Sequence, residues 1–88
     1  MSTKPPSSVA QFTPESLEAV AYASVSDIPT QEFNDRNRLG YCVWAYLKER
    51  RGTLELAVKS SGVRSTMEEK DIVAEVRKKL GKKGILDI

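Results

Sequence analysis

The sequence predicts a mainly α-helical fold: a single small domain of three or four helices, with or without a short C-terminal β element. Three observations lead to this fold class. The chain has 88 residues, which is short for more than one domain. Apolar residues between Leu39 and Leu47 recur at the spacing of a helix face. Helix-starting and helix-ending residues, such as Thr13 and Gly52, divide the remainder into segments of helical length.

The N-terminal residues 1–11 are expected to form a flexible tail, because they contain Pro5, Pro6 and several serines but few large side chains. The domain is then expected to span residues 12–88. A first helix should begin at Pro14, since Thr13 can cap it and proline suits a first helical turn. It is expected to end near Ser24.

A second helix is predicted from about Gln31 to Arg51. Pro29 breaks the preceding helix, and Thr30 is the expected N-cap. Gly52 is the expected end signal. The inward stripe of this helix is the clearest periodic signal in the chain and comprises Leu39, Cys42, Val43, Tyr46 and Leu47. Cys42 is interpreted as a small core residue and not as a reactive thiol.

Residues 53–61 fit both a strand and a helix, and we favour the helix. Gly62 then suits a turn. The segment 66–69 reads as a capping box with Thr66 as the cap, opening a helix that runs to Leu80. Residues 85–88 alternate like a short strand, so β structure is possible there and at residues 53–58.

The predicted core collects the apolar residues on the inward stripes of these segments. It consists of Leu17, Val20, Leu39, Val43, Tyr46, Leu47, Val58, Ile72, Val76 and Leu80.

The composition excludes several classes of chemistry. There is no histidine and only one cysteine, which removes Ser-His-Asp and Cys-His catalysis, zinc fingers and internal disulfides. No glycine loop leads into a helix to cradle a phosphate, and no two acidic residues share an apolar setting. We therefore expect no enzymatic activity, no metal and no cofactor. No apolar run approaches the roughly 18 residues of a membrane span, so we expect a soluble, cytoplasmic protein without membrane contact.

Charge is segregated along the chain. Residues 1–35 carry one lysine against five acidic residues, whereas residues 36–88 carry 13 basic and 7 acidic residues. Five of the seven residues from Arg77 to Lys83 are cationic. If these face outward as a continuous positive surface, they can contact phosphates. The alternatives are a solvated helix end that compensates the helix dipole, and a surface for an acidic protein.

The stretch from residue 53 to residue 88 resembles winged-helix and helix-turn-helix DNA-binding domains. The resemblance rests on Leu56-Ala57, Ser61-Gly62-Val63, the capped helix with Val73, Val76 and Leu80, and Gly84-Ile85-Leu86-Asp87-Ile88. These would be the second helix, turn, recognition helix and first wing strand. The resemblance implies that Arg64, Lys70, Arg77 and Lys78 contact the groove or phosphates, with Lys82 and Lys83 at the wing.

A second candidate surface lies on the helix around Trp44. Tyr41, Trp44 and Lys48 project nearly opposite the inward stripe, so that one helix face cannot bury them all. They are either covered by other helices or exposed as anchors for a protein partner, with base stacking as a third option.

Two functional hypotheses follow. The first is a small non-enzymatic DNA-binding regulator, which would act as a homodimer if it reads a symmetric site. The second is a protein-interaction module, an adaptor or inhibitor that docks onto a larger protein through Tyr41, Trp44 and Lys48.

Overall fold

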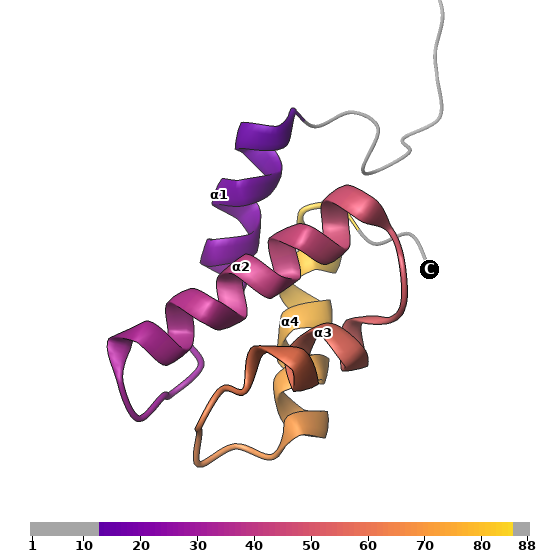
Figure 1. The fold of residues 1–88 in the computed structure, drawn as a ribbon. Helices are drawn as coiled ribbons and strands as arrows, with labels where there is room; N and C mark the ends of the chain where they lie inside the picture. Colours follow the sequence, from indigo (N-terminus) through magenta and orange to yellow (C-terminus); the bar gives the residue numbers. More distant parts are fainter. Residues whose placement is uncertain (1–12, 86–88) are drawn as a thin grey trace, which may run out of the picture.

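A computed structural model describes residues 13–85, over which the chain forms four helices and no strand (Figure 1). The helices are α1 (Pro14–Ser24), α2 (Phe33–Glu49), α3 (Leu54–Ser61) and α4 (Glu69–Lys82). The mainly helical fold is therefore confirmed. The predicted tail, residues 1–11, and the strand residues 86–88 lie outside the described part of the chain.

Helix α1 has the predicted limits and the predicted cap. The hydroxyl of Thr13 accepts a hydrogen bond from the backbone N–H of Ser16 at 3.1 Å. After Ser24, the N–H of Val25 donates to the carbonyl of Tyr22 at 3.3 Å, which tightens the last turn.

Helix α2 is two residues shorter at each end than predicted. Its N-cap is Glu32 and not Thr30, because the Asp35 carboxylate accepts the Glu32 N–H at 3.1 Å. The Thr30 hydroxyl instead donates to the Glu32 carbonyl at 2.9 Å. At the other end Arg50 adopts a left-handed φ of 54°, so the helix ends before Gly52.

Residues 54–61 are helical, so the strand alternative for residues 53–58 is wrong. The Thr53 hydroxyl accepts the Leu56 N–H at 3.1 Å and fixes the first turn. Leu54 and Val58 then point into the core. Gly62 ends the helix with a left-handed φ of 66°, as predicted for the turn.

The predicted capping box at Thr66 is also wrong. The N-cap of α4 is Glu68, and its side chain makes no capping bond. The N–H of Met67 donates to the hydroxyl of Ser65 at 3.0 Å, so this loop has a turn of its own before the helix begins. The helix continues past the predicted end at Leu80 to Lys82.

One apolar cluster lies among the four helices. All ten predicted core residues belong to it, eight of them buried and two, Val20 and Tyr46, partly buried against the others. The predicted core placement of Cys42 is only partly right, since its side chain is half-buried. The cluster also contains Ala21, Val25, Ile28, Leu54, Val73 and Ile85.

Helix α2 contacts both α1 and α3, and α4 contacts α3 and α1, so the four helices enclose the core. The packing of α1 on α2 depends on Gly40. A Cβ atom at this position would lie 2.4 Å from Cδ1 of Tyr22. The missing side chain therefore lets the Tyr22 ring lie on α2. None of the helices in residues 13–85 has the length and apolar character of a membrane span.

Candidate functional site

The first three cations of the predicted positive surface, Arg77, Lys78 and Lys79, are paired with acidic residues of the same molecule. Arg77 lies 3.3 Å from a carboxylate oxygen of Glu55, and Lys78 lies 3.7 Å from one of Glu75. The third cation, Lys79, lies 2.5 Å from Asp27. The expectation of a continuous, unpaired positive surface from Arg77 to Lys83 is therefore wrong for its first half.

Helical geometry explains this dispersal. Consecutive α4 residues turn by about 100° and so face different neighbours. Arg77 reaches α3, whereas Lys79 reaches the turn after α1. The hydrogen bond to Asp27 raises the pKa of Lys79 despite its desolvation, and it lowers the pKa of Asp27.

The six predicted nucleic-acid residues do not form one surface. Arg64 precedes α4 and Lys70 lies in its first turn, 3.8 Å from Glu68. Lys82 and Lys83 lie at the other end of the 14-residue helix, about 20 Å away at 1.5 Å per residue. Both are exposed, and neither has a carboxylate of residues 13–85 within 4.0 Å. The first turn of α4 also carries Glu69 and Asp71, which repel phosphates.

Arg64 belongs to a different cluster, built around Asp35. The Asp35 side chain is fully buried and pairs with Arg38 on α2 and with Arg64, whose Nη2 lies 3.2 Å from Oδ2. Arg38 also donates to the carbonyl of Ser61 at 3.2 Å. Burial raises the pKa of Asp35, but the hydrogen bonds from Arg64 and Glu32 and the two arginine charges outweigh it, and the net pKa is lowered.

Sequence reasoning missed Asp35 and Arg38. The available signal was the spacing of Glu32 and Asp35, three residues apart as in a capping box. The carboxylate here both caps α2 and anchors the loop between α3 and α4, which pattern alone does not indicate.

The predicted partner-binding residues do come together on α2. The rings of Tyr41 and Trp44 meet edge to face, with centroids 5.9 Å apart and planes at 78°. The Nζ atom of Lys48 lies 4.0 Å from the Trp44 ring centroid. Trp44 is partly buried against the core, whereas Tyr41 is 55% exposed.

Phe33 extends this surface and was not predicted. It is 70% exposed, the highest value among the large apolar side chains in residues 13–85. At 100° per residue, the α2 aromatic face, defined as Phe33, Tyr41, Trp44 and Lys48, occupies a sector of about 80°. The spacing from Phe33 to Tyr41, two helical turns, was the signal available in the sequence.

The C-terminal end of α2 is positively charged. Lys48, Arg50 and Arg51 are exposed there, beside a single acidic neighbour, Glu49. Across the described chain, no carboxylate lies within 4.0 Å of these three cations. Lys48 of the α2 aromatic face therefore lies at a basic helix end, whereas Arg51 lies on the side of α2 that faces α3.

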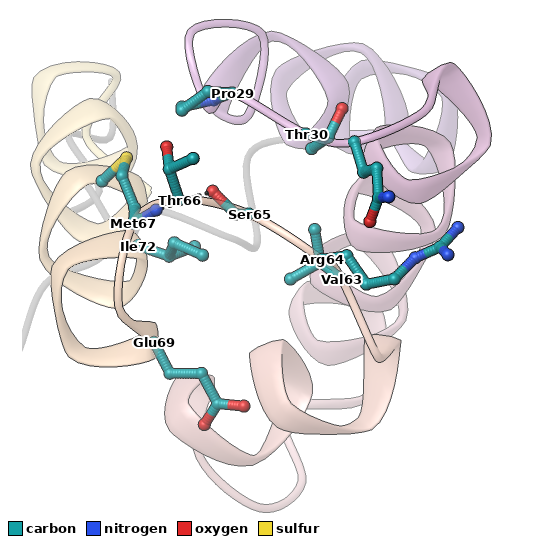
Figure 2. A pocket seen from close by; sticks show the side chains of 10 residues that line it. Pro29, Thr30, Val63, Arg64, Ser65, Thr66, Met67, Glu69 and Ile72 are labelled. Atoms are coloured by element: carbon teal, nitrogen blue, oxygen red, sulfur yellow. Dashed lines mark hydrogen bonds between the residues drawn. The ribbon is translucent and has the colours of Figure 1, made fainter.

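A pocket of about 560 Å³ lies between the loop before α2 and the loop before α4 (Figure 2). The two loops are joined by a hydrogen bond from the N–H of Gln31 to the carbonyl of Arg64, at 2.9 Å. We call this hollow the loop pocket. Its lining comprises Pro29, Thr30, Gln31, Val63, Arg64, Ser65, Thr66, Met67, Glu69 and Ile72.

A smaller hollow of about 210 Å³ between α2 and α3 has Cys42 in its lining. Burial raises the pKa of the Cys42 thiol, which disfavours the thiolate that a nucleophile or metal ligand requires. In residues 13–85 no three Cys, Asp or Glu side chains gather into a group that could hold a metal ion.

Comparison with models of known protein families, with curated proteins and with solved structures finds no match to this chain. The winged-helix resemblance of residues 53–88 stays a prediction from the sequence.

Proposed function

We propose that this chain is a non-enzymatic protein-interaction module that docks onto a larger protein through the α2 aromatic face. The observation that carries the proposal is the exposure of Phe33 and Tyr41, at 70% and 55%, on one face of a single helix. Tyrosine and tryptophan are the residues that most often dominate binding energy at protein interfaces.

The face is also preorganised for binding. The Tyr41 ring is held against Trp44, and Trp44 is held against the core and beneath Lys48. Side chains that are already fixed lose less conformational freedom on association. More of the energy gained by burying the rings is then available as affinity.

The charges at the end of α2 define the chemistry of the partner. Lys48 lies on the α2 aromatic face, and Arg50 and Arg51 follow it at the end of the helix. A complementary partner therefore presents an apolar cleft for the rings, with carboxylates at one end. Such a partner binds faster at low salt than at high salt, because exposed charges steer the encounter.

We test this proposal by photo-crosslinking followed by affinity measurement. A photoreactive phenylalanine analogue in place of Tyr41 should crosslink one partner in cells that express the full chain. With that partner purified, Tyr41→Ala should weaken binding by at least about tenfold in calorimetry.

Lys59 is the matched control, since it is exposed on α3, away from the α2 aromatic face. The analogue at Lys59 should not capture the same partner, and Lys59→Ala should leave the affinity unchanged. Equal crosslinking from both positions, or full affinity in Tyr41→Ala, would contradict docking through α2.

DNA binding is the second candidate, and the exposure of Lys82 and Lys83 without an acidic partner in residues 13–85 favours it. If these lysines contact phosphates, replacing both by alanine should reduce the salt slope of binding to labelled duplex DNA by about 2, or one per lysine. Stability should hardly change, because both side chains are exposed. Absence of salt-sensitive DNA binding by the unaltered chain would remove this candidate.

A further inference from the structure

The loop pocket has the size and apolar surface of a small-molecule site. Its volume of about 560 Å³ lies within the ~300–1,000 Å³ typical of such sites. Val63, Met67 and Ile72 provide apolar walls, and Pro29 lies across from them (Figure 2). All three wall residues belong to or pack against the core, so the walls are supported from behind.

Some polar groups that line the pocket already have a hydrogen-bond partner within the protein, and others do not. The Thr30 hydroxyl donates to the Glu32 carbonyl, and the Ser65 hydroxyl accepts from Met67. By contrast, the Thr66 hydroxyl and the Gln31 side chain make no hydrogen bond to any residue from 13 to 85. These two groups are available to a ligand.

One edge of the pocket carries a cation, Arg64, which belongs to the Asp35 cluster. Arg64 and Arg38 share the single buried carboxylate of Asp35, which leaves a surplus of one positive charge at this cluster. The Arg64 side chain is 55% exposed and pairs with Asp35 through Nε and Nη2. Since a guanidinium has five N–H donors, Arg64 retains donors for a second carboxylate.

We infer that the loop pocket binds a small amphipathic carboxylate, a molecule of about the size of octanoate with one acid group on an apolar body. The body lies against Val63, Met67 and Ile72, and the carboxylate accepts from Arg64. This site is independent of the proposed docking function, because it shares no residue with the α2 aromatic face.

Glu69 provides a further test of the inference. Its carboxylate also lines the pocket and repels a bound anion. Figure 2 shows Glu69 and Arg64 on different sides of the opening. Removing the Glu69 charge should therefore strengthen binding of an acid, while removing a negative charge outside the pocket should not.

The test is an NMR titration of the ¹⁵N-labelled full chain with sodium octanoate, and with octanol as the neutral probe of equal length. Octanoate should shift the amide signals of residues 29–31 and 63–67, with an affinity at least about tenfold higher than that of octanol. Equal affinities, or shifts confined to other residues, would overturn the inference.

Variants separate recognition of the ligand's carboxylate from nonspecific hydrophobic binding to the protein surface. Glu69→Gln should tighten octanoate binding roughly twofold. Its control, Glu68→Gln, removes a neighbouring negative charge that does not line the pocket and should have no effect. Thr66→Trp should fill the pocket and abolish binding, whereas Lys59→Trp should not. Octanoate binding that survives Thr66→Trp would show that the site lies elsewhere.

Discussion

Replacing Asp35 by alanine is expected to lower the melting temperature, Tm, by about 10 °C or more at neutral pH, which thermal circular dichroism can measure. The substitution removes the buried carboxylate that Arg38 and Arg64, both about half exposed, share, and it removes the acceptor for the Glu32 N–H. The loss is costly because the charge-assisted hydrogen bonds of two arginines and one helix-capping bond disappear together.

Asp71→Ala is the matched control for this loss. Asp71 is an exposed acid in the first turn of α4 and has no side-chain ion pair with any residue from 13 to 85. Its removal should change the Tm by only a few degrees. Equal effects of the two substitutions would show that the Asp35 cluster does not hold the loop to α2.

The same carboxylate should make stability depend on pH in the acid range. The pKa of Asp35 is lower in the folded state than its ordinary value, so the folded protein holds fewer protons there than the unfolded chain. Its stabilising contribution is present above the unfolded pKa of about 3.9 and is lost as pH falls through the folded pKa.

The Asp35→Asn variant should therefore show a flatter Tm below about pH 4 than the unaltered chain. Asp27 is the control, because its pKa is also lowered but its carboxylate is exposed. Asp27→Asn should retain most of the pH dependence. An equally steep acid loss in Asp35→Asn would assign that loss to other carboxylates.

The sequence allowed the helices to be predicted, but only some of their ends. Periodicity and the caps at Thr13 and Thr53 act within one turn, so they can be read from neighbouring residues. The start of α2 depends instead on Asp35, which is held by Arg64 from 29 residues away. The only local signal was the spacing of Glu32 and Asp35, and the contact with Arg64 leaves no signal near the start of the helix.

For the candidate surfaces, too, local patterns could be predicted from the sequence and long-range contacts could not. Tyr41, Trp44 and Lys48 lie on one helix, and their shared face follows from helical periodicity alone. The pairing of Lys79 with Asp27 joins residues 52 positions apart, so the cluster from Arg77 to Lys83 looked like a continuous positive surface in the sequence. The loop pocket needs two loops brought together by the fold and had no sequence signal.

The second large effect is expected at Gly40. Gly40→Ala should lower the free energy of unfolding by about 1–3 kcal/mol in urea denaturation, because the new methyl group would overlap the Tyr22 ring. Either the Tyr22 ring or the whole of α1 must move away from α2 to relieve the clash. The loss occurs even though alanine is the better helix former.

Gly81→Ala separates the clash from helix propensity. Gly81 also lies inside a helix, α4, but a Cβ atom there would meet nothing within 4 Å. This substitution should therefore raise the free energy of unfolding by about 0.5–1 kcal/mol. Opposite signs at two helical glycines would isolate the contribution of the close approach.

A double-mutant cycle then identifies the atoms that clash. In a Tyr22→Ala background the ring is absent, so the cost of Gly40→Ala should largely vanish and the two substitutions should couple. If Gly40→Ala costs the same in both backgrounds, the Tyr22 contact is not what requires glycine. If coupling is found, a single missing side chain on α2 sets how closely α1 approaches the helix that carries the α2 aromatic face.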